Sequence, residues 1–308
     1  DALELRLRAL LRRGAGAADR LEEDGASEQA TGLHLYRHPQ APSDTERRFK
    51  LYRRGALSLT RVLPLFTHLG LEVTDERPYE VDGPDGQVLH VYDFGLQAAD
   101  ARAWGTAETS ADARARFEDA FRAVWVGEAE SDGFNALVLA AGLTWRQVLI
   151  LRMVAKYLRQ TGSTFSQNYV ESALGSHPAI ARSLVELFEV RFDPDAFAAD
   201  PAGVEQRATR SGALVEGISG ALDTVASLDH DRIIRALLGV VLATSRTNYY
   251  QVDDGGSPKP YVSIKLDPKQ VPDLPAPRPM FEIWVYGPRV EGVHLRFGRV
   301  ARGGLRWS

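Results

Sequence analysis

The hydrophobic periodicity of this chain changes twice, and that change constrains the fold more than any other feature. Between Ser110 and Arg246 the apolar side chains recur at the three- and four-residue spacing of α-helices. On both sides of this stretch they alternate in short runs, which is the pattern of β-strands. The sequence therefore predicts an α+β chain: a small antiparallel sheet with a helix, then a helical bundle, then the first strands of another module.

The stretch before the bundle divides into two parts. Leucines form a helical stripe in ALELRLRALLRR, and a small, polar segment follows it, so residues 1–32 predict a helix and a linker. In residues of about 33–98, LHLYRHP and ERRFKLYRRG read as strands, and LEVTDERPYEV and QVLHVYDFGLQ flank the hairpin signal DGPDG. Between these pairs we expect one helix, with Ser58 as N-cap and Gly70 as its stop, although Pro64 fits it poorly.

The bundle and the module after it have clear boundaries. One helix runs from a Thr144 cap to Gly162, and further helices follow in FSQNYVESALG, PAIARSLVELFEVRF, GALVEGISGALDTVASL and DRIIRALLGVVLATSR. After Asn248 the runs YVSIKL, FEIWVYG and VHLRFG predict strands, joined by a loop and a proline-rich connector. The chain starts on Asp1 and stops directly after an apparent strand, so we expect an excerpt of a longer protein.

Composition excludes several classes of function. The net charge is -4 with the arginines scattered among acids, which argues against a nucleic-acid partner. The absence of cysteine removes disulfides, thiolate chemistry and cysteine-ligated zinc, and it fits the cytoplasm. No apolar run approaches the roughly 20 residues of a membrane span, so we expect no membrane association.

Few residues carry a recognisable chemistry. No pair of the seven histidines has helical i, i+4 spacing beside a carboxylate, so we expect no metal site and interpret His177 and His230 as helix caps or surface residues. No GxGxxG or phosphate loop follows a strand, so no nucleotide site is visible. The pair Tyr249 and Tyr250 suits either stacking on a ligand ring or core packing.

The C-terminal stretch PRVEGVHLRFGRVARGGLRWS is richer in candidates. Its arginines stand at positions 289, 296, 299, 302 and 306, and Gly303 and Gly304 leave the backbone open to a ligand. A guanidinium offers a fork of donors that matches the two oxygens of a carboxylate, which suits an amino acid or a keto acid. A hairpin with a solvated cationic rim fits the same spacing, and the residues alone leave both interpretations open.

Three stretches resemble a known family. RTNYYQ at Arg246–Gln251, FEIWVYGPRVEGVHLRFGRVARGGLRWS at Phe281–Ser308, and the segment Tyr157–Pro194 are similar to the large bacterial NAD-specific glutamate dehydrogenases. That resemblance implies a regulatory half with ACT-like domains, helical segments, and a catalytic region with substrate and NAD-binding domains. Applied here it gives a helix and linker at 1–32, an ACT-like regulatory domain at 33–105, a helical domain at 106–246, and truncated substrate-domain strands at 247–308.

The resemblance also implies a reaction: NAD-dependent oxidative deamination of L-glutamate to 2-oxoglutarate and ammonium. In the smaller enzymes a lysine before Gly-Gly reaches the side-chain carboxylate of glutamate, and the resemblance places Arg302, followed by Gly303 and Gly304, at that position here. The catalytic lysine and aspartate and the NAD-binding domain lie downstream of this pattern. We therefore assign the chain no catalytic, cofactor-binding or metal-binding residue and expect it to be inactive alone.

The expected partners follow from the same resemblance. The ACT-like domain implies an amino-acid effector, and such domains commonly pair across subunits, so we expect a homo-oligomer. A different class of function fits the chain alone: a non-catalytic module that senses a metabolite or assembles subunits.

Overall fold

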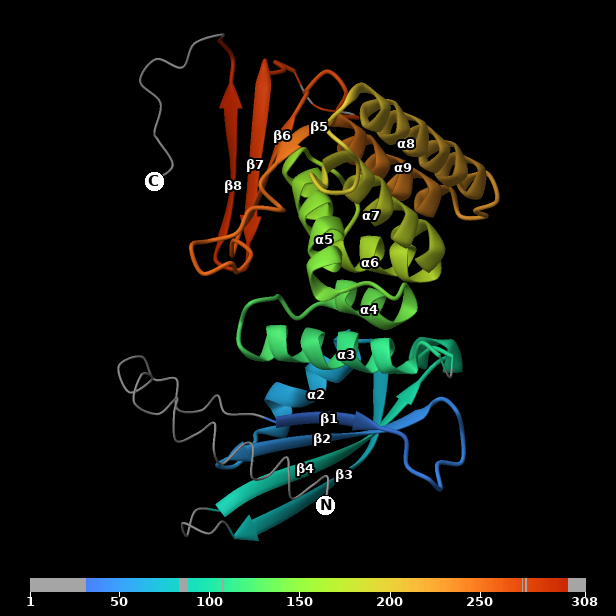
Figure 1. Ribbon diagram of the computed structural model, residues 1–308, viewed down its shortest axis with the longest axis vertical. Helices are drawn as coiled ribbons and strands as arrows, with labels where there is room; N and C mark the ends of the chain where they lie inside the picture. Colours follow the sequence, from blue (N-terminus) through green and yellow to red (C-terminus); the bar gives the residue numbers. More distant parts are fainter. Residues whose placement is uncertain (1–31, 83–87, 107, 273, 275, 299–308) are drawn as a thin grey trace. The chain divides into compact units, whose positions relative to one another are not determined.

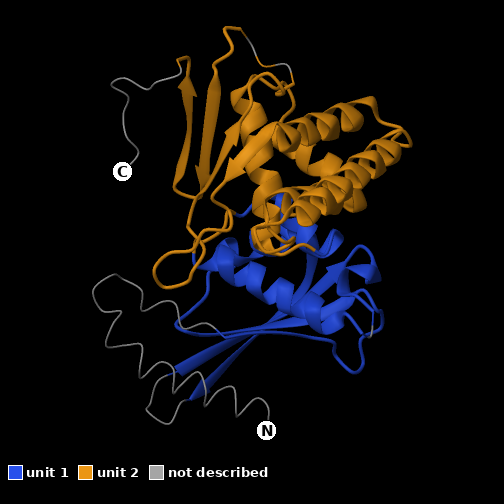
Figure 2. Cartoon of the chain, turned by 45° about the horizontal axis from the view of Figure 1, so that its top comes forward, with its two compact units in different colours: residues 1–126, 131–142 blue, residues 127–130, 143–308 orange. Residues whose placement is uncertain are grey.

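The computed structural model describes residues 32–82, 88–106, 108–272, 274 and 276–298. The helix predicted in residues 1–32 and the turn of the predicted hairpin after Asp82 therefore lie outside the described residues. Within them the chain forms two compact units, which Figure 2 colours separately. Unit 1 comprises the residues up to Val126 together with Ser131–Gly142. Unit 2 comprises Gly127–Glu130 together with the residues from Leu143 onwards.

Unit 1 is built on a four-stranded antiparallel sheet. Its strands are β1 (Gly32–Tyr36), β2 (Glu46–Arg54), β3 (Leu71–Asp82) and β4 (Val88–Ala98), in the order β1-β2-β4-β3. All four strands were expected from the alternating runs, and β3 and β4 pair as the hairpin signal predicts. Shorter elements complete the unit: η2 (Ala101–Trp104), η3 (Gly133–Ala136) and α4 (Leu137–Ala140).

The predicted helix of this unit forms as α2 (Leu59–His68). Ser58 has the extended backbone of an N-cap, but its hydroxyl contacts Thr60 Oγ1 at 2.7 Å and makes no capping bond to the helix. Pro64 lies inside α2. Gly70 follows the helix with φ of 80°, a left-handed conformation that glycine adopts without steric cost, and this explains why the helix stops there.

A second helix, α3 (Ser110–Trp125), also packs on this sheet (Figure 1). The ring of Phe49 on β2 lies 5.5 Å from that of Phe66 on α2, and 5.4 and 4.8 Å from those of Phe117 and Phe121 on α3. All four rings are fully buried. The expectation of one helix on the sheet was therefore incomplete: α3 has the helical period of the bundle, but its aromatic stripe closes the core of unit 1.

Unit 2 begins with five helices: α5 (Trp145–Gln160), α6 (Gln167–Ser176), α7 (Pro178–Phe192), α8 (Pro201–Leu222) and α9 (Leu228–Ala243). The predicted cap of α5 is present as a capping box, in which Thr144 accepts from the Gln147 backbone and Gln147 accepts from the Thr144 backbone. The bounds of two predicted helices differ from the expectation. α8 runs from Pro201 to Leu222 rather than over residues 212–228, and the end of the last predicted helix forms a strand.

That strand starts the sheet of unit 2, which has the antiparallel order β5-β6-β7-β8. Its members are β5 (Thr244–Thr247), β6 (Val262–Leu266), β7 (Phe281–Gly287) and β8 (Val290–Arg296). The last three were expected from the alternating runs after Asn248. Both units together confirm the α+β class, with a sheet and helices, then a helical segment, then a second set of strands.

Candidate functional site

The predicted substrate contacts follow β8 in the sequence. Arg302, Gly303 and Gly304 lie outside the described residues, which end at Gly298. Their proposed role therefore stays a prediction. What the structure does describe is the strand pair β7–β8 that leads to them, and the way in which β7 is held on α5.

Alternate side chains of β7 form one buried face, because successive residues of a strand point to opposite sides of the sheet. Glu282, Trp284 and Tyr286 are all buried. The Trp284 indole Nε1 donates to the backbone oxygen of Met153 on α5 at 3.2 Å. Glu282 and Tyr286 make side-chain hydrogen bonds. Each buried position of β7 thus has a polar partner either on α5 or on the segment that precedes α5.

The first of these contacts joins Glu282 to Tyr157. The Tyr157 hydroxyl donates to Glu282 Oε2 at 2.8 Å, and Glu282 is only 4% exposed. Burial raises the pKa of Glu282, and the hydrogen bond from Tyr157 partly opposes that rise. Burial also raises the pKa of Tyr157, with a further contribution from the Glu282 carboxylate. The phenol therefore keeps its proton and stays a donor to the acid.

The second contact joins Tyr286 to Glu130 through a hydrogen bond from the phenol to the carboxylate. Nε of Arg152 lies 3.6 Å from Glu130 Oε2, and Arg152 is 1% exposed. A buried guanidinium is costly without an opposite charge, so Glu130 compensates Arg152 as well as anchoring Tyr286. These contacts fix β7, which in turn pairs with β8 along its full length.

The two histidines that the sequence suggested as caps or surface residues lie next to each other. His177 Nε2 is 3.3 Å from His230 Nδ1, although 53 residues separate them. His177 holds the N-cap position of α7, but its side chain makes no capping bond. Burial and His230 both lower the pKa of His177. Among the described residues no group of three or more His, Asp or Glu side chains is placed to hold a metal ion.

Of the two roles considered for the tyrosine pair, Tyr249 takes the packing role. Tyr249 is buried, with its ring against Phe188, and the Arg146 guanidinium lies 5.0 Å from its ring centroid. Arg146 also donates to the backbone oxygen of Tyr249 at 3.1 Å. This ring is therefore occupied by protein contacts.

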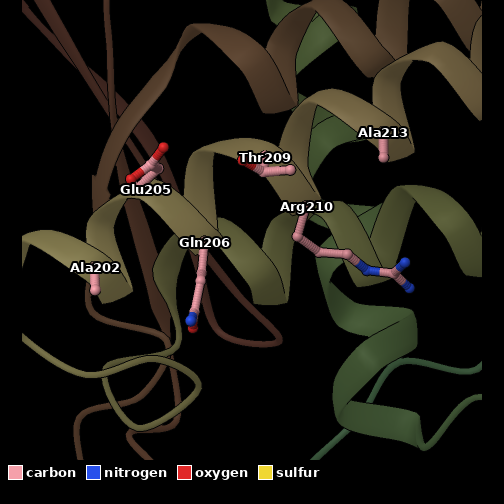
Figure 3. A pocket seen from close by; sticks show the side chains of 6 residues that line it. All are labelled: Ala202, Glu205, Gln206, Thr209, Arg210 and Ala213. Atoms are coloured by element: carbon pink, nitrogen blue, oxygen red, sulfur yellow. The ribbon is translucent and has the colours of Figure 1, made fainter.

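A hollow of about 570 Å³ lies along α8. Figure 3 shows the six side chains that line it: Ala202, Glu205, Gln206, Thr209, Arg210 and Ala213. All six belong to a single helix, and Arg210 is paired with Glu186 on α7. The hollow thus brings together no set of groups from different elements that would select a ligand. None of the described helices has the length and apolar character needed to cross a membrane.

Comparison with known proteins gives three consecutive matches. The sequence models of the glutamate dehydrogenase ACT3 domain, of glutamate dehydrogenase helical motif 3, and of the bacterial NAD-glutamate dehydrogenase catalytic domain match residues 30–109, 129–194 and 217–308. Their order along the chain is that of the sheet, the helices and the second sheet.

Curated relatives agree with these matches. NAD-specific glutamate dehydrogenases from Halomonas elongata and Mycobacterium tuberculosis are each 46% identical, over 84% and 82% of this chain and 15% of their own length. That of Pseudomonas aeruginosa is 43% identical over 92% of this chain and 17% of its own length. The chain thus spans about a sixth of the relatives that it matches. It belongs to the family of bacterial NAD-specific glutamate dehydrogenases.

Proposed function

We propose that the full-length protein oxidatively deaminates L-glutamate to 2-oxoglutarate and ammonium, with NAD⁺ as hydride acceptor, in the cytoplasm. The observation that carries this proposal is the catalytic-domain match over residues 217–308, which includes the sheet β5–β8 and the stretch that contains Arg302. The relatives named for this activity support it over more than four-fifths of the chain.

Within that reaction we assign Arg302 to the side-chain carboxylate of glutamate. Its guanidinium stays protonated at any working pH, so it binds and orients glutamate and moves no proton. Gly303 and Gly304 leave the adjacent backbone free of side chains, which lets a ligand approach it closely. The division of the chain into a regulatory part at 33–105, a helical part at 106–246 and a catalytic part from 247 remains part of this proposal.

The test is an assay of the full-length protein for NADH formation from L-glutamate and NAD⁺, and for the reverse reaction from 2-oxoglutarate and ammonium. We expect both directions to proceed. A full-length protein that is folded and inactive in both would refute the assignment. The 308-residue chain alone should form no NADH and give no saturable heat with NAD⁺ in calorimetry, because the family's catalytic lysine and nucleotide-binding domain lie downstream of the Arg302 pattern.

We also propose a regulatory role for unit 1, which the ACT3-domain match over residues 30–109 supports. In this role the unit binds a small effector and contributes to a homo-oligomer. Size measurement on residues 30–142 tests the second part: we expect self-association that grows with concentration, whereas a monomer at every concentration contradicts it.

A further inference from the structure

The chain passes from unit 1 into unit 2 and back within one short stretch. Gly127–Glu130 belongs to unit 2, whereas α3 before it and Ser131–Gly142 after it belong to unit 1 (Figure 2). The contacts of Glu130 and of the residues that follow it explain why the chain divides there, because the two sides of this peptide bond are held in different units.

Glu130 is bound to two elements of unit 2. Its carboxylate accepts from the Tyr286 hydroxyl on β7 and lies 3.6 Å from Nε of Arg152 on α5. Both partners are 1% exposed, whereas the Glu130 side chain is 31% exposed. Glu130 therefore lies at the surface of unit 2 and reaches into its interior, where a buried guanidinium requires an opposite charge.

The next residues are held in unit 1. The Ser131 hydroxyl lies 2.8 Å from Nδ1 of His68 on α2. Asp132 caps η3 by accepting from the Phe134 backbone N–H at 3.2 Å, and the Phe134 ring is fully buried. The chain between Glu130 and Phe134 therefore joins an anchor in one unit to an anchor in the other with little slack. This link is covalent, so it does not depend on how the two units are placed.

A row of packed side chains leads from Glu130 along β7. The ring of Tyr286 stacks on that of Trp284, with centroids 6.4 Å apart and planes inclined by 8°. Trp284 meets the Tyr157 ring edge-on at 6.0 Å, and the Tyr157 hydroxyl donates to Glu282. Contiguous packing of this kind can carry a displacement from one end of the row to the other.

Glu282 brings this row to the far end of β8. It pairs with Leu295, next to Arg296, the last residue of β8, and Arg302 follows in the sequence. We propose that Glu130 is a positioning residue for the proposed reaction: through this row it sets the strand pair β7–β8, and with it Arg302, according to the state of unit 1. The inference rests on the proposed function for its effect on glutamate, but not for the link between unit 1 and β7.

The first test is hydrogen exchange in the 308-residue chain. Phe121→Leu loosens the core of unit 1, where this ring packs against Phe49 and Phe66. Opening of unit 1 frees the residues after Glu130 and so weakens the hold of Glu130 on β7. The backbone amides of β7 should therefore exchange about threefold faster or more than in the parent chain.

A Gly-Ser-Gly insertion between Glu130 and Ser131 separates the link from the contacts. It keeps the side chains of both units and adds up to about 10 Å of slack. In this background Phe121→Leu should no longer change the exchange of β7. The same insertion between Gly255 and Gly256, in an exposed loop of unit 2, is the matched control and should leave the response of β7 in place.

The second test is steady-state kinetics of the full-length protein. Glu130→Gln keeps an acceptor for Tyr286 but removes the charge that faces Arg152. It should raise KM for glutamate about fivefold and leave kcat within about twofold, because the displaced contact binds substrate and moves no proton. Glu186→Gln, which removes a carboxylate from the exposed pair with Arg210, is the control and should leave KM unchanged. Circular dichroism checks that every variant is folded.

Three results would overturn the inference. The first is exchange of β7 that does not respond to Phe121→Leu, and the second is a response that persists after the insertion beyond Glu130. The third is an unchanged KM for Glu130→Gln in an active full-length enzyme. A folded full-length protein without activity would refute the proposed function instead, and the exchange of β7 would still decide the link to unit 1.

Discussion

The Tyr157 hydroxyl lies 2.8 Å from Oε2 of Glu282 and joins the last turn of α5 to the start of β7 inside unit 2. Both side chains are buried, and 125 residues separate them in the sequence. A buried carboxyl that accepts from a phenol is stable when it is protonated and costly when it is charged. We therefore expect the stability of unit 2 to depend on pH.

The first prediction concerns that dependence. The pKa of Glu282 is raised in the folded chain, so the folded state binds more protons than the unfolded state between the two pKa values. The stabilisation from its protonation is complete below the unfolded pKa, about 4.3, and is lost as the pH rises through the folded pKa. Glu282→Gln keeps an acceptor for Tyr157 without a charge. Urea unfolding should show a smaller loss of stability with rising pH in this variant.

Tyr157→Phe is the companion variant. It leaves the buried carboxyl without its donor and should lower the free energy of unfolding by about 1–3 kcal/mol at neutral pH. If Glu282→Gln followed the same stability profile with pH as the parent chain, Glu282 would not be the titrating group.

The second prediction concerns α3. Phe121 packs against both Phe49 and Phe66, so Phe121→Ala should destabilise unit 1 by about 3–5 kcal/mol in denaturant unfolding. For the same reason a chain of residues 30–105, which lacks α3, should not fold cooperatively, whereas residues 30–142 should. A cooperative transition of residues 30–105 at the stability of residues 30–142 would show that α3 is not needed.

This helix also marks the limit of what the sequence predicts. Local sequence signals predict local structure. The capping box of Thr144 and Gln147 forms at the start of α5, and Gly70 adopts the left-handed conformation that ends α2. Periodicity indicates which face of a helix is apolar but not what covers that face, so α3 was expected in the bundle. The contact of Tyr157 with Glu282 depends on the pairing of distant segments, and no short pattern carries that information. The bulge at Thr74 on β3, opposite Gly95 on β4, likewise depends on how distant segments pair.

The third prediction concerns the histidine pair of unit 2. Burial and His230 lower the pKa of His177 in the folded chain. Below about 6.5, the ordinary pKa of a histidine in the unfolded chain, the unfolded state therefore binds more protons than the folded state. Stability should therefore fall as the pH drops below that value. His230→Gln removes the second imidazole and should reduce this loss, as thermal unfolding between neutral and mildly acidic pH would measure.

A histidine of unit 1 serves as its control. His68 contacts the Ser131 hydroxyl at 2.8 Å and has no histidine neighbour among the described residues. His68→Gln should retain the acid sensitivity of unit 2. Equal acid sensitivity in the parent chain and in His230→Gln would contradict the role of the pair.

The last prediction concerns Arg302 in the full-length protein. If its guanidinium holds the side-chain carboxylate of glutamate, Arg302→Ala removes a charge-assisted interaction of about 1.5–3 kcal/mol, which is roughly a ten- to hundredfold loss in the use of glutamate. The loss should fall mainly on KM, because the contact exists in the ground state and in the transition state. Binding of NAD⁺ should be unchanged. Steady-state kinetics with glutamate varied at saturating NAD⁺ measures both parameters.

Arg302→Lys sharpens this test, because it places in the chain the cation that the smaller glutamate dehydrogenases use at this position. A lysine restores the charge but not the planar fork of donors, so it should recover only part of the activity. The alternative interpretation, a hairpin with a solvated cationic rim, gives a different prediction. In that case neither variant would change KM or kcat, because Arg302 would contact only water. The two interpretations that the residues left open are therefore separated by the kinetics of these two substitutions.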